Sequence, residues 1–174
     1  KAKSELEVDV NEMTSMLDSY VSFVKTESPE PIETIIINEL IGDIVKTVEK
    51  NGVELIIKEK NTIQTSGRQI QLKRAFNNII DNSQRYAKKI EIILYTNEKD
   101  CVIEFNDNGE GIPRDKYEDV FKPFFTLDPS RNKLKGESGL GLTITRDIIR
   151  SHGGDVKLSD SNLGGLQLKV LLPL

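Results

Sequence analysis

The first 27 residues carry apolar side chains at the spacing of a helix that packs against another helix. Steps of four and three residues alternate along this stripe, which consists of Leu6, Val10, Met13, Leu17, Tyr20 and Val24. One such stripe cannot bury itself, so the helix needs a partner helix. The segment SPEP at Ser28–Pro31 should end it, because proline lacks an N–H and clashes inside a helix. We therefore expect a helical arm over residues 1–27, a linker over residues 28–31 and a second unit over residues 32–174.

After the linker, segments with the period of a strand alternate with segments with the period of a helix. Strands are predicted at Glu33–Ile37, Val53–Lys58, Thr62–Ser66, Lys89–Thr96, Cys101–Asn106, Asp155–Ser159 and Gln167–Leu172. Helices are predicted at Asn38–Asn51, Gln69–Ala87 and Leu142–Ser151, with a short one near Asp115–Phe121. This order predicts a two-layer α/β sandwich, in which helices cover one face of a sheet. The stretch Lys122–Ser138 is irregular and too long for an ordinary connection, which is typical of lids and binding loops.

The predicted helix Gln69–Ala87 has two different faces. Its apolar stripe can face the sheet and consists of Leu72, Phe76, Ile79, Ile80, Ser83 and Ala87. Beside the stripe runs a polar ridge of Arg74, Asn78, Asn82 and either Arg85 or Tyr86. Asn78 and Asn82 lie one turn apart, although asparagine is a poor helix former. Two amide oxygens beside phosphates would suit Mg²⁺, which takes few protein ligands. The alternative is that both amides are solvated or form local hydrogen bonds.

The stretch FNDNGEGIP runs a strand-like segment into an acidic, glycine-rich turn. Such turns often hold phosphate, but Asp107 and Glu110 would repel an anion. A carboxylate can instead accept a hydrogen bond from the exocyclic amine of adenine. Gly109 and Gly111 would let a flat base approach the backbone closely. The alternative is an ordinary surface turn, for which Asp-Asn-Gly is also suited.

A second glycine group, GESGLGL at Gly136–Leu142, leads directly into a predicted helix. Flexible backbone followed by the N–H groups at the positive end of a helix is suited to phosphate, although it could also be a plain helix entry after a mobile loop. Phe121, Phe124 and Phe125 cluster beside this loop, where they would either anchor it to the core or stack on a base. The loop also carries Arg131, Lys133 and Lys135, which are either phosphate contacts or solvated charges.

Composition excludes several classes of function. The 28 acidic and 24 basic residues are intermixed, which argues against binding to nucleic acid or a membrane surface by bulk charge. Cys101 is the only cysteine and His152 the only histidine, so an internal disulfide is excluded and a histidine metal site is disfavoured. The apolar runs are far shorter than the roughly 20 residues of a membrane span. No signal-peptide pattern follows Lys1, and we expect the chain to be a fragment of a longer protein.

The order of four segments, NNIIDNSQRYA, DNGEGI, FKPFF and GESGLGL, resembles the N, G1, F and G2 boxes of the ATP-binding domain of sensor histidine kinases. The resemblance covers residues 32–174 nearly end to end, including the closing SHGGDVKLSDSNLGGLQLKVLLP. It implies the Bergerat-type fold, a mixed sheet with helices on one face, which gyrase, the Hsp90 chaperone and MutL-type repair proteins share. The segment PFFTLDPSRN is similar to that of osmosensor-type kinases.

This resemblance implies that the chain binds ATP and Mg²⁺, with Asn82 as the metal ligand and Asn78 one turn earlier. Both asparagines are expected to be catalytic and to contact the nucleotide. Asp107 would bind adenine and contact only the base, in a pocket shaped by Gly109, Gly111 and Ile112. The other residues expected to contact the nucleotide are Arg85, Tyr86, Phe121, Arg131, Lys133, Lys135, Gly136, Gly139, Leu140, Gly141 and Leu142. Lys122–Ser138 would be the lid over ATP, and Glu137 stands where many relatives have glycine.

Asn78 bears on the type of reaction. In the ATP-hydrolysing relatives the matching residue is a glutamate that activates water, and a neutral amide is a poor general base. Phosphoryl transfer depends above all on positioning and charge neutralisation. The resemblance therefore favours a protein-histidine kinase over an ATPase. An anti-sigma-type serine protein kinase, or a non-enzymatic dimerisation or scaffold module with a degenerate nucleotide site, is the alternative.

The phosphate acceptor of the family is a histidine on the first helix of a dimeric helical hairpin, and no such motif occurs here. His152 lies in RSHGGD and is expected to end a helix. The arm resembles the second helix of that hairpin, so we expect a catalytic fragment that cannot phosphorylate itself alone. The implied partners are the missing acceptor helix, a second copy in a homodimer and a response regulator, with no nucleic acid. The resemblance also implies the cytoplasmic portion of a receptor anchored in the inner membrane.

Overall fold

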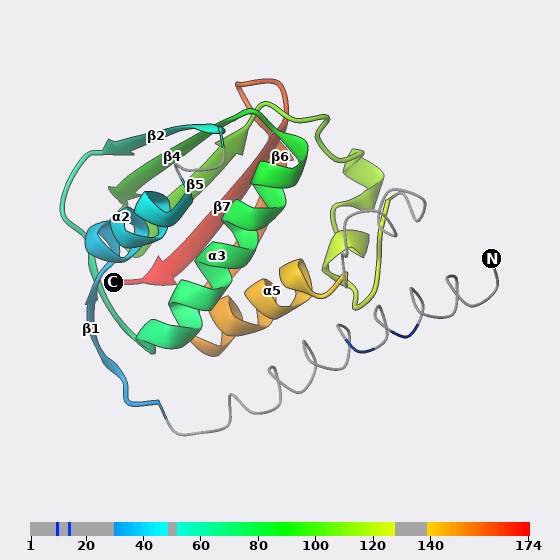
Figure 1. Cartoon of the computed structure of the whole chain (residues 1–174). Coiled ribbons are helices and arrows are strands. Elements are labelled where there is room, and N and C mark those ends of the chain that lie inside the picture. Colours follow the sequence, from blue (N-terminus) through cyan, green and yellow to red (C-terminus); the bar gives the residue numbers. More distant parts are fainter. Residues whose placement is uncertain (1–9, 11–13, 15–29, 49–51, 128–138) are drawn as a thin grey trace, which may run out of the picture.

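The structure is a computed structural model that describes residues 10, 14, 30–48, 52–127 and 139–174 (Figure 1). Most of the arm expected over residues 1–27 lies outside these residues, as does part of the linker. Val10 and Thr14 are helical, and the Thr14 hydroxyl donates a hydrogen bond to the carbonyl oxygen of Val10 at 2.7 Å. In the part of the chain that is described, no helix has the length and apolar character needed to cross a membrane.

Among the described residues there are two sheets, and the larger has five strands in the order β2-β4-β5-β7-β6. These strands are β2 (Glu54–Glu59), β4 (Lys89–Thr96), β5 (Asp100–Asp107), β6 (Asp155–Asp160) and β7 (Leu166–Pro173). Strands β2 and β4 pair in parallel and every other pair in this sheet is antiparallel, so the sheet is mixed. In this register Asp107, the last residue of β5, lies opposite Ile90 near the start of β4.

Three α-helices cover one face of this sheet (Figure 1). They are α2 (Ile37–Val48), α3 (Gln69–Tyr86) and α5 (Gly141–Ser151). Two short 3₁₀ helices, η3 (Arg114–Lys116) and η4 (Asp119–Phe121), follow β5. The predicted two-layer α/β sandwich is confirmed.

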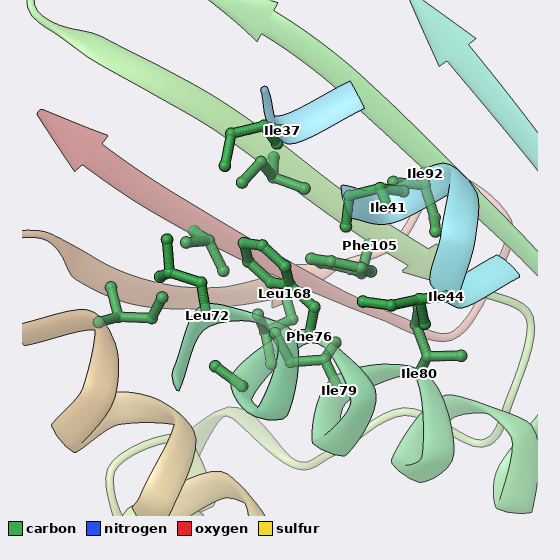
Figure 2. Close-up of a cluster of buried hydrophobic side chains, with 14 of the residues drawn as sticks. Ile37, Ile41, Ile44, Leu72, Phe76, Ile79, Ile80, Ile92, Phe105 and Leu168 are labelled. Carbon is green, nitrogen blue, oxygen red and sulfur yellow. The ribbon is translucent and has the colours of Figure 1, made fainter. Parts of the chain in front are cut away.

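The core lies between the helices and the sheet (Figure 2). All six positions of the apolar stripe predicted for α3 are buried, with Phe76 and Ile80 fully so. The ring of Phe76 packs against that of Phe105 on β5, with centroids 6.1 Å apart. The residues that β4 and β5 contribute to the core cluster alternate along each strand, as the period of a strand requires. The stripe on α3 thus faces the sheet and leaves the polar ridge beside it at the edge of the core.

Two predicted elements differ from the structure. Strand β1 (Glu33–Ile36) pairs with β3 (Gln64–Gly67) in a separate two-stranded antiparallel sheet. The chain turns into α2 directly after β1, and the Ile37 N–H donates a hydrogen bond to the Ile63 carbonyl at this turn. The short helix predicted near Asp115–Phe121 is present as two separate 3₁₀ helices, η3 and η4. Other element boundaries lie within a few residues of those predicted.

Candidate functional site

Asp107 is a buried carboxylate at the end of β5, only 5% exposed. Its Oδ1 accepts two backbone hydrogen bonds, from Gly109 N at 2.9 Å and from Leu166 N at 3.0 Å. Among the described residues no donor reaches Oδ2. The expectation that Asp107 contacts only a base is therefore wrong, because one of its oxygens is committed to the protein. The other oxygen is left as an acceptor beside the turn.

The turn after Asp107 is held against its neighbours. Asn108 Oδ1 accepts hydrogen bonds from Lys88 N at 3.0 Å and Lys89 N at 2.9 Å, which ties the turn to the α3–β4 junction. A Cβ placed on Gly109 would lie 2.9 Å from the Tyr86 carbonyl oxygen, so the backbone passes close to the end of α3. Gly111 has a φ of +71°, a conformation that favours glycine. Both glycines predicted to shape a pocket are thus required by the geometry of the turn.

The two asparagines of α3 lie on one ridge and are both half-buried. Asn78 Nδ2 donates to the carbonyl oxygen of Gly141, the first residue of α5, at 3.3 Å. The amide of Asn82 has no hydrogen-bond partner among the residues that the structure describes. Asn78 therefore joins the two helices, whereas Asn82 offers an uncommitted amide one turn further along α3.

Other charged and aromatic groups on α3 lie near this ridge. Burial lowers the pKa of Arg74 from its ordinary value. Burial raises the pKa of the Asp81 carboxyl, an effect that the positive charge of Arg85 partly opposes. Arg85 and Tyr86 are exposed at the C-terminal end of the helix. In the described ranges, His, Cys, Asp and Glu side chains form no group of three or more that could hold a metal ion.

A backbone hydrogen bond joins the two ends of the long loop that was predicted as a lid. Phe124 N donates to Gly139 O at 3.0 Å, and the two residues have φ values of +63° and +64°. Such a φ is strained for phenylalanine, and it persists where the surroundings impose it. A Cβ on Gly139 would lie 2.8 Å from the Cα of Phe124, so only glycine fits here. The hydrogen-bonded pair fixes where the loop leaves and rejoins the domain.

Phe121 anchors the start of this loop, which is one of the two alternatives that the sequence left open. The ring is buried, and the Arg146 guanidinium lies 4.5 Å from its centroid while also pairing with Glu118 at 2.8 Å. The Thr143 hydroxyl donates to the Phe121 carbonyl at 3.0 Å. Of the two remaining aromatics, Phe125 packs against the core and Phe124 is 54% exposed.

Helix α5 begins at Gly141, beside Asn78. Its N-cap residue, Leu140, is buried and has no polar side chain to cap the first N–H groups. Leu142 and Ile112 are half-buried and pack against the core. The predicted site residues Arg131, Lys133, Lys135 and Gly136 lie outside the described residues.

His152 ends α5, as predicted from the sequence. Its Nδ1–H donates to Ile148 O at 2.7 Å, and its Nε2 accepts from Arg68 N at 3.0 Å. Both ring nitrogens are therefore engaged in joining the end of α5 to the start of α3.

Sequence reasoning missed two residues that contact Asp107. Leu166 is the first residue of β7, and Gly165 is the last residue of the β6–β7 connection, which Figure 1 shows at the same end of the sheet as the end of β5. The adjacent glycines in LGGLQL are a signal of close backbone approach, but the sequence alone does not show what approaches.

The family described as histidine kinase-, DNA gyrase B- and HSP90-like ATPase matches residues 67–174. The sensor histidine kinase GtrS of Pseudomonas aeruginosa is 30% identical over 168 residues, which cover 95% of this chain and 34% of that relative. The sensor histidine kinase CpxA of Escherichia coli is 30% identical over 182 aligned positions, which cover 100% of this chain and 40% of CpxA. The chain thus spans well under half the length of these curated relatives.

Solved structures of similar proteins agree with this match. A mycobacterial sensor histidine kinase, MprB, superposes with a TM-score of 0.72 at 25% identity, over 82% of this chain and 97% of that chain. The catalytic domain of the histidine kinase ThkA reaches the same TM-score of 0.72 at 22% identity, over 82% of this chain and 95% of its own, and supports the fold alone.

Proposed function

Because the chain belongs to the family of histidine kinase-, DNA gyrase B- and HSP90-like ATPases and is an ATP-binding catalytic domain of the sensor histidine kinase type, we propose that Asp107 selects the adenine of ATP. The observation that carries this proposal is the half-committed carboxylate. Oδ1 is fixed by two backbone N–H groups, and Oδ2 is left to accept a hydrogen bond from an exocyclic amine. A hydrogen bond to a buried, charged acceptor contributes about 1.5–3 kcal/mol.

Asn82 is proposed to hold Mg²⁺ through its amide oxygen. The residues present fit this metal, because Asn82 is half-buried and uncommitted among the described residues and a neutral oxygen beside phosphates suits a cation that keeps several waters. When bound, Mg²⁺ would neutralise charge on the transferring phosphate. Asn78 is proposed to support Asn82 by fixing α3 against the first residue of α5.

The start of α5 is proposed to receive phosphate. Its first N–H groups lack a side-chain cap from Leu140, and they lie at the positive end of the helix. Gly139, Gly141 and Leu142 would place the backbone close to the nucleotide. Arg85, Tyr86 and the loop cations Arg131, Lys133 and Lys135 are proposed as further contacts, with residues 122–138 forming the lid.

The reaction we propose is transfer of the γ-phosphate to a histidine. Asn78 offers a neutral amide where the hydrolysing relatives have a carboxylate base, so attack by water is not assisted. The groups around the site would hold the nucleotide and neutralise charge, which phosphoryl transfer requires. The acceptor would lie on a helix outside this chain, since His152 is engaged through both ring nitrogens.

In the whole protein, the proposed acceptor helix pairs with the helical arm over residues 1–27 in a homodimeric hairpin, and phosphate passes on to an aspartate of a response regulator. We propose that this domain works on the cytoplasmic side of a membrane-anchored receptor. These proposals rest on the sensor kinases that the chain resembles over its full length.

The test is a titration of this chain with ATP, with and without Mg²⁺, followed by incubation with γ-labelled ATP. The chain is incubated alone, and then with a helical hairpin bearing the family-type histidine. We expect binding that Mg²⁺ strengthens, no label on the chain alone and label on the added histidine. Failure to bind ATP in either condition would remove the kinase assignment, and label on a serine would favour the serine kinase instead.

A further inference from the structure

The connection between β6 and β7 closes around Asp107. Within it, Ser161 N donates to Gly165 O at 2.8 Å and Gly164 N donates to Ser161 O at 3.0 Å, which makes a tight turn. The turn then contacts Asp107 twice. Gly165 N donates to the main-chain oxygen of Asp107 at 3.1 Å, and Leu166 N donates to its Oδ1 at 3.0 Å. One turn therefore fixes both the backbone and the carboxylate of the same residue.

Gly165 leaves no room for a side chain at this contact. A Cβ there would lie 2.2 Å from Asp107 Oδ1, 2.5 Å from Gly109 N and 2.7 Å from Asp107 O. Two of these atoms are backbone, and the third belongs to a short side chain that two N–H groups hold. Because the carboxylate is the group that can rotate, any side chain at position 165 must displace it or push the turn away.

The neighbouring glycine, Gly164, is required for the conformation of the turn and not for the contact with Asp107. Gly164 has a φ of +99°, so the turn needs glycine there for its backbone conformation, yet a Cβ on it would meet nothing within 4 Å. Gly165 is absent from the positive-φ residues among those described, so its requirement is steric. The two glycines form a matched pair, of which only Gly165 touches Asp107.

From these contacts we infer that the Gly165–Leu166 backbone, where the β6–β7 turn enters β7, is the positioning element that sets base specificity. It rotates the Asp107 carboxylate so that Oδ1 is saturated by the protein and Oδ2 is presented to the base. This inference rests on the proposed function, in which Asp107 reads adenine. It assigns selectivity to a segment that lies more than 50 residues after Asp107 in the sequence.

Asp107 Oδ2 would distinguish bases by the group that they carry at C6 of the purine ring. The amine of adenine donates to it, whereas the carbonyl that replaces this amine in inosine triphosphate places one acceptor against another. We expect the unaltered chain to bind ATP about tenfold or more tightly than inosine triphosphate, the ratio that a single well-placed hydrogen bond supports. A turn that only stabilises the fold would change both affinities together and leave this ratio alone.

The experiment measures the affinity of the whole chain for both nucleotides by calorimetry, in four proteins: unaltered, Asp107→Asn, Gly165→Ala and Gly164→Ala. Asp107→Asn should invert the preference, because an amide N–H replaces Oδ2 and can donate to the carbonyl. Gly165→Ala should reduce the ratio to about twofold or less, a loss of most of the selectivity of one hydrogen bond. Gly164→Ala should lower Tm through its backbone conformation and leave the ratio as in the unaltered chain.

The outcomes separate the two proposals. If the unaltered chain shows no preference, or Asp107→Asn leaves the preference unchanged, the proposed reading of adenine by Asp107 fails. If that preference exists and depends on Asp107, but Gly165→Ala retains it, the positioning inference is overturned. A loss in Gly164→Ala as large as that in Gly165→Ala would also overturn it, since the turn as a whole would then be responsible.

Should Gly165→Ala fail to fold, NMR of the unaltered chain decides the question. The Leu166 amide proton, bonded to Asp107 Oδ1, should shift when ATP engages the carboxylate and shift less than half as far at saturation with inosine triphosphate. Equal shifts with both nucleotides would contradict the inference.

Discussion

At the scale of single residues, Asp107 combines a structural and a binding role. Its Oδ1 is the acceptor for Gly109 N and Leu166 N, and the residue is buried. Removing the carboxylate leaves two backbone donors without a partner, whereas an amide of the same shape keeps an oxygen in the position of Oδ1. Asp107→Ala therefore removes both the backbone hydrogen bonds to Oδ1 and the proposed contact of Oδ2 with the base, whereas Asp107→Asn changes mainly the second.

We predict that Asp107→Ala lowers the free energy of unfolding by about 1–3 kcal/mol, the cost of leaving buried donors unsatisfied. Asp107→Asn should lose less than half as much stability while inverting the preference for adenine over hypoxanthine. Urea unfolding of the nucleotide-free proteins measures the first effect. Equal losses for the two variants would show that the backbone hydrogen bonds to Oδ1 do not contribute.

The second prediction at this scale concerns Asn82. Asn82→Ala should weaken ATP binding in the presence of Mg²⁺ by about tenfold, and affect metal-free binding by less than twofold, because the amide is proposed to contact the metal alone. Asn77→Ala is the matched control, since it makes the same change on the same helix beside the ridge. Isothermal calorimetry in Mg²⁺ and in a chelator decides the matter, and equal losses in both conditions would remove the metal role.

At the scale of elements, hydrophobic period predicted most of what the structure contains. The stripe on α3 and the alternation on β4 are local properties of the chain, and both are seen. The separate pairing of β1 with β3 was not predictable, because it depends on the turn of the chain at Ile37 and on contacts made at long range. The contact between Leu166 and Asp107 was not predictable for the same reason, because it joins two segments that are distant in the sequence.

Strand β5 carries a titratable group that the proposed reaction does not use. Burial, and secondarily the charge of Asp100, raises the pKa of the Cys101 thiol from 9.0 to about 12. Above pH 9 the unfolded chain releases this proton while the folded chain keeps it, so stability falls as pH rises. The slope approaches about 1.4 kcal/mol per pH unit between the two values.

We predict that Cys101→Ala removes this part of the pH dependence. Its free energy of unfolding should fall less steeply than that of the unaltered chain between pH 9 and pH 11, as measured by urea unfolding at each pH. Val102→Ala is the control, since it also truncates a buried side chain on β5 but leaves the thiol in place. Parallel curves for Cys101→Ala and the unaltered chain would contradict the assignment.

At the scale of the whole molecule, the domain is tied to the segment that precedes it at the N-terminal end of α3. Arg68, the N-cap residue, makes no side-chain cap, and the carboxylate of Glu30 takes that place. It accepts hydrogen bonds from Ile70 N and, at 3.3 Å, from Gln71 N. A negative charge at the positive end of the helix strengthens this contact. Glu30, which the sequence placed in a linker, therefore caps the helix that carries Asn78 and Asn82.

The final prediction is that Glu30→Ala destabilises the domain by about 0.5–2 kcal/mol, the range for loss of a helix cap. The stability of Glu30→Gln should lie between those of Glu30→Ala and the unaltered chain, because glutamine keeps one acceptor oxygen and loses the charge. Glu33→Ala is the control, since it removes an exposed glutamate from the nearby strand β1. Urea unfolding measures the stabilities, and hydrogen exchange at Ile70 and Gln71 locates the effect. If Glu30→Ala matches the unaltered chain in both stability and hydrogen exchange, Glu30 does not stabilise α3, the helix of the proposed metal site.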